Sequence, residues 1–196
     1  MIFDFDKTEP SDRYKLTAQT AIPRPIAWII TKDKSINIAP FSYFTPLSSN
    51  PPTLIVSIGH KSSGEPKDTL RNIRNTKKCT ICIAGETQLE KLHFSSKELD
   101  ANISEAKEFD VKLKEAEVGF PPMVEGSPVA YFCEFYEEID LKGSETIPII
   151  LEIKKLFVDD SAITDSKKLR IDFNPLARVG ANYGFIGEKI LAPKIP

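Results

Sequence analysis

The chain has 196 residues, 41% of them hydrophobic, and a formal net charge of -2. This length suffices for one well-buried core, and a pI of about 5.8 lacks the basic footprint of a nucleic-acid-binding domain. No apolar run approaches the roughly 18 residues that span a bilayer, and the acidic start MIFDFDKTEP lacks the features of a secretory signal. We therefore expect a single domain over residues 1–196, located in the cytoplasm, with neither a nucleic acid nor a membrane as partner.

The first half of the chain contains three stretches with strand character. Residues 25–31, PIAWIIT, form a continuous apolar run that leads through a turn-like Asp33-Lys34-Ser35 into residues 37–44, NIAPFSYF. A third stretch, residues 54–59, lies between a proline-rich breaker and the polar loop 60–66. The pattern predicts a hairpin followed by a further strand.

Pro40 interrupts the second of these stretches. A proline removes a backbone donor from a sheet and is tolerated only at an edge or a bulge. A bulge would turn neighbouring N–H groups away from the sheet, where a ligand could accept their hydrogen bonds, whereas an edge strand protected against aggregation would need no ligand. We expect the strand to kink at Pro40, and the stretch alone leaves both explanations open.

From residue 68 onward the apolar spacing becomes helical. Leu70 and Ile73 recur at helical intervals and Asp68 suits the first turn, which predicts a short helix that ends near Thr76. Residues 79–84 then predict a fourth strand. Between residues 86 and 116, apolar positions recur at helical intervals among many charges, which predicts one or two amphipathic surface helices. Residues 129–140 and 147–159 predict two more strands.

The three cysteines are too few for a disulfide framework, in agreement with a reducing compartment. Cys79 and Cys82 form a CxxC pattern, but their β-branched neighbours predict a strand, on which residues three apart point to opposite faces. We therefore expect strand cysteines, at least one of them in the core; a thiol redox site is the alternative. We expect no metal site, since only His60 and His93 could complete one, and we interpret His93 as a helix-face residue.

Six strands joined by short turns, with helices to one side, predict a mainly β fold: a small antiparallel barrel with peripheral helices. Dinucleotide-binding and P-loop glycine motifs and the nucleophile elbow are all absent, so no catalytic side chain can be nominated from them. One segment suits an anion. Lys67-Asp68-Thr69 stands at a predicted helix start beside the strand end Ser57-Ile58-Gly59, where free N–H groups, a hydroxyl and an ammonium group come together. An ordinary helix start with a solvated lysine would have the same sequence.

Five separated stretches follow one another between about residue 24 and residue 183: RPIAWIIT, NIAPFSYFTPLSSNPPTLIVSIG, KDTLRNI, GSPVAYFCEF and PLARVGANY. In this order and at these intervals, the sequence resembles the flavin reductase-like family of FMN-binding split-barrel proteins, which includes flavoredoxins. The resemblance implies a Greek-key antiparallel split β-barrel with a helical insertion around residues 86–118. It also implies a homodimer with FMN in a groove near the subunit interface.

The resemblance further implies an oxidoreductase that moves hydride or electrons from NADH, NADPH or a reduced carrier through FMN to flavin or another acceptor. Arg24 and Pro25 would border the flavin, with Arg24 close to N1 and O2, while residues 39–42 and the side chain of Asn37 or Ser42 would meet the isoalloxazine edge. The phosphate would lie at Ser57 and residues 67–69, with Asp68 capping the helix. The expected cofactor-binding residues are Arg24, Pro25, Asn37, Ala39, Pro40, Phe41, Ser42, Ser57, Lys67, Asp68 and Thr69.

Two departures from the family pattern bear on the electron donor. Many members that use NAD(P)H have a Gly-Asp-His triplet where this chain reads Gly143-Ser144-Glu145, and Gly180-Ala181 stands where a Gly-Gly pair is frequent. Neither change removes an expected FMN contact, but both weaken the expectation of direct hydride transfer from NADH or NADPH. A non-catalytic FMN-binding carrier or sensor is therefore the alternative function.

Overall fold

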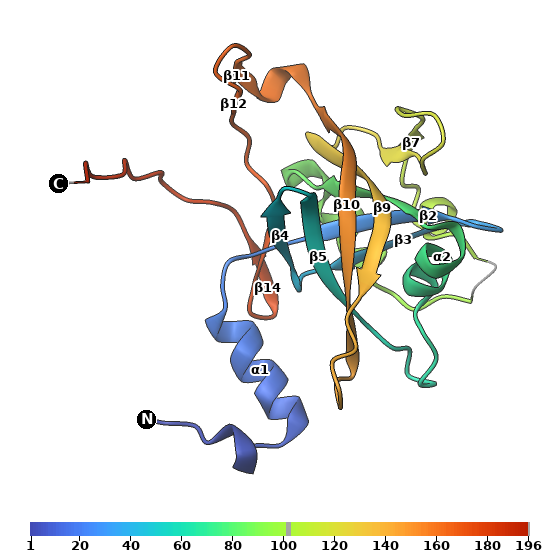
Figure 1. Cartoon of the computed structure of the whole chain (residues 1–196), viewed down its shortest axis with the longest axis vertical. Helices are drawn as coiled ribbons and strands as arrows, with labels where there is room; N and C mark the ends of the chain where they lie inside the picture. The colour runs from blue at the N-terminus through green and yellow to red at the C-terminus, as the bar shows by residue number, and fades with distance from the viewer. Residues whose placement is uncertain (101–102, 196) are drawn as a thin grey trace.

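The computed structural model describes residues 1–100 and 103–195; residues 101 and 102, within the expected helical insertion, lie outside the described residues (Figure 1). Its centre is a seven-stranded antiparallel sheet in the order β3-β2-β6-β9-β10-β5-β4. The sheet curls into a half barrel, which confirms the split β-barrel predicted from the sequence. The seven strands are β2 (Ala27–Lys32), β3 (Ile36–Phe41), β4 (Phe44–Ser49), β5 (Pro52–Gly59), β6 (Lys78–Ile83), β9 (Val129–Glu138) and β10 (Thr146–Val158).

Smaller elements surround this sheet. A three-stranded sheet joins β1 to a late hairpin in the order β1-β13-β14, and two further strand pairs are β7 with β8 and β11 with β12. None of the described helices is both long and apolar enough to cross a membrane. The strands are β1 (Arg24–Pro25), β7 (Leu113–Lys114), β8 (Met123–Val124), β11 (Ile163–Asp165), β12 (Arg170–Ile171), β13 (Ala177–Val179) and β14 (Asn182–Gly184). The helices are η1 (Phe5–Lys7), α1 (Pro10–Thr20), α2 (Asp68–Thr76), η2 (Glu86–Gln88), α3 (Leu89–Phe94), α4 (Glu105–Glu108) and η3 (Asp160–Ala162).

Helix α1 was not predicted from the sequence. It begins with Pro10 in the first helical position, where a missing N–H costs nothing, but Ala18 is its only buried residue. A helix that buries so little has no apolar stripe to reveal it in the sequence. In Figure 1 it projects away from the barrel.

Alternating side chains of the sheet build two apolar clusters. On β2, Ile29 belongs to the cluster inside the curled sheet, whereas Trp28 and Ile30 belong to a second cluster with residues such as Leu92 of α3. The same alternation places Cys79 in the first cluster and Cys82 in the second, which confirms the prediction of strand cysteines on opposite faces.

Pro40 lies in β3, an edge strand of the sheet. Its pairing with β2 runs from Ile36 to Phe41 without a register shift, so the expectation of a kink with a bulge is wrong. The Ile38 N–H donates to the Glu105 carboxylate and not to β2, and a residue two positions along a strand faces the same edge. Pro40 therefore stands where an N–H would point away from the sheet, and the proline costs no ladder bond.

Candidate functional site

Two adjoining cavities follow the free edge of β3. The larger, of about 240 Å³, includes Pro40 and Ser42 in its lining, and the smaller, of about 40 Å³, includes Asn37 and Ala39. Both include residues of β3 and both are lined by Ser96, so we describe them together as the β3 groove, with a narrow end at α2 and a wide end at the β13–β14 hairpin.

The narrow end contains the start of α2. Lys67 occupies the N-cap position and supplies no capping side chain, so the first N–H groups of the helix have no side-chain partner there. Lys61 and Lys67 line this end with ammonium groups. The expectation that Asp68 caps α2 is wrong, because no side chain among the described residues caps this helix. The Asp68 carboxylate instead lies 2.8 Å from Lys61 Nζ and also pairs with Arg71, and these cations neutralise its charge. This end of the groove has the donors that an anion such as a phosphate requires.

Buried hydrogen bonds from two asparagine side chains hold the start of α2 in place. Asn37 Nδ2 donates to Thr69 Oγ1 at 2.8 Å, and Asn72 Nδ2 donates to Thr31 Oγ1 at 3.0 Å. Both bonds join α2 to the strands of the hairpin. Because the Thr69 hydroxyl accepts from Asn37, its own proton remains free to be donated toward the groove.

Glu105 of α4 brings an opposing charge to the narrow end. Its carboxylate is buried and accepts the Ile38 N–H at 3.0 Å, and burial raises the pKa of this carboxyl, with the nearby Asp68 adding to the effect and Lys61 opposing it. The net charge at the narrow end therefore depends on how far Asp68 and Glu105 offset the lysines. The other charged groups that line this end are Lys67, Lys97 and Glu98.

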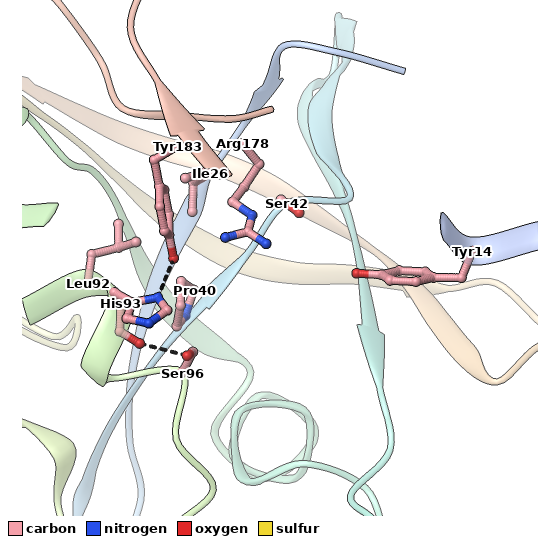
Figure 2. A pocket seen from close by; sticks show the side chains of 9 residues that line it. All are labelled: Tyr14, Ile26, Pro40, Ser42, Leu92, His93, Ser96, Arg178 and Tyr183. Carbon is pink, nitrogen blue, oxygen red and sulfur yellow. Dashed lines mark hydrogen bonds between the residues drawn. The ribbon is translucent and has the colours of Figure 1, made fainter. Parts of the chain in front are cut away.

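The wide end is assembled from distant elements (Figure 2). Arg178 comes from β13, Tyr183 from β14 and His93 from α3. His93 Nδ1 lies 3.0 Å from Tyr183 Oη, and the Arg178 guanidinium lies over the Tyr183 ring at 4.6 Å. These side chains give this end a guanidinium, an imidazole and an aromatic face.

Arg24 lies behind the wide end and holds the end of α1 beside the β13–β14 turn. Its guanidinium donates to the carbonyl oxygens of Ala18, of Ala21 at 3.2 Å and of Gly180 at 3.4 Å, and its side chain is buried. Arg24 thus clamps the end of α1 to the β13–β14 turn. Tyr14 of the clamped helix lines the groove, its ring stacked near that of Tyr43 with centroids 6.1 Å apart.

The structure brings together seven of the eleven expected cofactor residues along the β3 groove: Asn37, Ala39, Pro40, Ser42, Lys67, Asp68 and Thr69. Four lie elsewhere. Phe41 packs against the inner cluster, Ser57 pairs with β10, and Pro25 lines a separate apolar cavity of about 340 Å³. Arg24 makes the clamp and is not among the lining residues, so its contact with a flavin stays a prediction.

The residues missed from the sequence are those of the wide end: Tyr14, His93, Arg178 and Tyr183. A signal existed for two of them, because Arg178 and Tyr183 lie within PLARVGANY, one of the stretches that carried the family resemblance. His93 does lie on an exposed helix face, as expected, but it also lines the groove.

Comparisons with known proteins agree with this architecture. Residues 19–176 match the model of the family described as flavin reductase like domain. Nitrilotriacetate monooxygenase component B from Bacillus cereus is 27% identical, with a TM-score of 0.90 over 98% of both chains. The fold is also similar to 2-nitrobenzoate 2-nitroreductase NbaA of Pseudomonas fluorescens, with 24% identity and a TM-score of 0.88 over 100% of this chain and 96% of that one. It is similar as well to flavoredoxin of Desulfovibrio vulgaris, with 22% identity and a TM-score of 0.75 over 88% of this chain and 91% of that one. The chain therefore belongs to the flavin reductase-like family.

Proposed function

We propose that this protein is an FMN-dependent oxidoreductase that holds FMN in the β3 groove and passes hydride or electrons from a donor to flavin or another acceptor. The observation that carries the proposal is the polarity of the groove. Its narrow end offers a helix start, lysines and a hydroxyl, and its wide end offers a guanidinium and aromatic rings. A phosphate suits the first set of groups, and an isoalloxazine ring suits the second.

The phosphate end of FMN would be held by Lys67, the Thr69 hydroxyl and the first N–H groups of α2. Asn37 acts through Thr69, because its amide fixes the orientation of that hydroxyl. Asp68 makes no favourable contact with an anion and instead anchors Lys61 and Arg71 beside the site. The Lys67, Asp68 and Thr69 segment expected from the sequence is therefore kept as the phosphate site.

The ring end would lie against Pro40 and Ser42, beneath the His93–Tyr183 pair. Positive charge near N1 and O2 stabilises anionic reduced flavin, and Arg178, which lines the cavity, is better placed for this than Arg24, which is occupied by the α1 carbonyls. When bound, FMN supplies the hydride and electron chemistry itself. The residues of this chain bind it, orient it and limit the access of water to it.

NADH or NADPH is the proposed donor, with a reduced carrier protein as the alternative donor. The turn at residues 143–145 has no histidine of its own, but His60 Nδ1 lies 3.1 Å from the Glu145 carbonyl oxygen, so an imidazole stands beside this turn. The names of two similar structures support catalysis over mere binding: a nitrilotriacetate monooxygenase component B and a 2-nitrobenzoate 2-nitroreductase.

A thiol mechanism has no support from the geometry. Cys79 and Cys82 are both fully buried, point to opposite faces of β6 and have no exposed sulfur that could attack a disulfide. Burial raises the pKa of Cys82 to about 12, and a hydrogen bond with Cys133 together with burial raises that of Cys79. Three free buried cysteines agree with the reducing cytoplasm as the proposed location.

We also propose a homodimer, as the family resemblance implies. Helix α1 projects from the barrel in Figure 1 and carries exposed aromatic residues on its flank, with Phe3 and Phe5 before it and Tyr14 on it. A partner that covered this arm would also border the wide end of the groove, which Tyr14 lines. Light scattering of the purified protein measures the mass and tests this assignment.

The function is tested by an absorption spectrum from 300 to 600 nm of the purified protein with added FMN, repeated after anaerobic addition of NADH and then NADPH. We expect stoichiometric FMN uptake and bleaching of the bound flavin bands. Bound flavin that no donor bleaches, including a reduced carrier protein, would favour the non-catalytic carrier or sensor. A protein that takes up no FMN would overturn the proposal.

A further inference from the structure

A second cavity, of about 630 Å³, lies behind the wide end of the β3 groove. His93 and Tyr183 line both hollows, so these two side chains, joined by their 3.0 Å hydrogen bond, form the partition between them. Figure 2 shows the pair from the groove side. We call this hollow the rear cavity; its size lies within the range of small-molecule sites.

The rear cavity has an apolar floor. Leu89 and Phe94 come from α3, and the turn of the β13–β14 hairpin closes the opposite side with Asn182. Phe94 is 44% exposed, and its ring contacts that of Phe109 in a tilted arrangement, with ring centroids 6.0 Å apart. An aromatic ring that is held in place and open on one face is a platform for a flat ligand.

The rim of the rear cavity is acidic. Glu86 and Glu90 line it, are exposed, and form no ion pair with any residue of the described ranges 1–100 and 103–195. Within the same ranges no lysine or arginine lines this cavity, whereas the wide end of the β3 groove, on the other side of the partition, is lined by Arg178 and by no acidic residue. The two hollows on either side of the partition therefore favour charges of opposite sign.

We propose that the rear cavity is a binding site for a small aromatic cation, such as an aryl amidinium or an N-alkylpyridinium. Its ring would lie on Leu89 and Phe94, and its charge would face Glu86 and Glu90, with the Phe94 ring adding cation–π attraction. This site goes beyond the proposed function, because its groups bind the ligand whether or not FMN fills the groove.

The test uses three probes of the same shape and different charge: benzamidinium, benzamide and benzoate. Each is titrated into the full-length protein, with binding followed by calorimetry and mapped by backbone amide shifts in NMR spectra. We expect benzamidinium to bind roughly five to ten times more tightly than benzamide, since ion pairs with exposed carboxylates are weak. Benzoate should bind most weakly, and the shifted amides should lie in residues 86–94 and 181–183.

Two variants separate charge from shape. Glu86→Gln with Glu90→Gln should abolish the preference for benzamidinium over benzamide, whereas Glu137→Gln, an exposed substitution on β9, should leave it unchanged. Equal binding of all three probes to the unmodified protein, or amide shifts confined to other regions, would overturn the proposal.

Repeating the titration with FMN present separates this site from the groove. Benzamidinium should bind with unchanged affinity when FMN is saturating, because the partition lies between the two hollows. Competition between the probe and FMN would place the probe in the groove and overturn the rear site. If the protein takes up no FMN at all, the proposed function fails, while the titrations without FMN still decide the fate of the rear cavity.

Discussion

The two ends of the β3 groove are built in different ways. The narrow end combines Asn37 and Ala39 of β3 with the start of α2, Lys61, residues 95–99 and Glu105 of α4. Buried hydrogen bonds between Asn37 and Thr69 and between Asn72 and Thr31 hold α2 against the β2–β3 hairpin. The wide end comes from α1, α3, β13 and β14, and its side chains are more exposed. Both ends join segments far apart in the sequence, because the Asn37–Thr69 and Asn72–Thr31 bonds span 32 and 41 residues and the His93–Tyr183 bond spans 90. The narrow end is fixed by buried hydrogen bonds, whereas the wide end depends on more exposed side chains.

The largest effect is expected when the proposed phosphate contacts of the narrow end are removed. Lys67→Ala with Thr69→Ala should weaken FMN binding by roughly 2 to 4 kcal/mol, because one charged and one neutral hydrogen bond to phosphate are lost. Calorimetry with FMN would show this as a rise in Kd of roughly 30- to 700-fold. Lys34→Ala, an exposed lysine in the β2–β3 turn, is the matched control. Unchanged affinity in the double variant would mean that the phosphate binds elsewhere.

Arg24 and Arg178, the two arginines near the wide end, should differ in their effect on the stability of the fold. Arg24→Ala should lower the free energy of unfolding by about 2 kcal/mol, because the buried Ala18 carbonyl and the partly buried carbonyls of Ala21 and Gly180 lose a charged donor. Denaturant unfolding of the protein without FMN measures this loss. Arg178→Ala should change the stability little.

Substitutions of Arg24 and Arg178 also show which of the two sets the midpoint potential of bound FMN. Arg178→Ala should lower the midpoint potential of bound FMN by roughly 20 mV, the equivalent of about 1 kcal/mol for a two-electron couple, because the reduced anion loses a nearby positive charge. A spectroscopic redox titration measures it. A shift in Arg24→Ala without one in Arg178→Ala would restore Arg24 to the role that the family resemblance gave it.

A smaller effect should appear in the pH dependence of stability. Burial raises the pKa of Glu105 in the folded protein, so its contribution to stability is fully present below the unfolded pKa and is lost as the pH rises through the folded pKa. Glu105→Gln keeps an acceptor for the Ile38 N–H but cannot ionise. The stability of the wild-type protein relative to this variant should therefore fall as the pH rises above about 4.3. A pH-independent difference between the two would contradict this assignment.

The smallest effect is expected from modification or substitution of the three cysteines. With all three cysteines buried and the pKa of Cys82 raised to about 12, a thiol reagent at pH 8 should label the folded protein only as fast as it unfolds. Cys79→Ser with Cys82→Ser should leave FMN binding and flavin reduction intact. Rapid labelling of the native protein, or loss of flavin reduction in a variant that still folds, would revive the thiol alternative.

The sequence by itself predicted six of the seven strands of the central sheet, all except β4, together with helix α2, because apolar periodicity and helix-start chemistry are local. The anion site at the start of α2 stays a prediction. The cysteines on opposite faces of β6 followed from strand geometry in the same way. Only the tertiary structure decided the rest. It paired His93 with Tyr183, 90 residues away, occupied Arg24 with backbone carbonyls and left Arg178 facing the groove. Those contacts depend on how distant segments pack against one another, which no local pattern records.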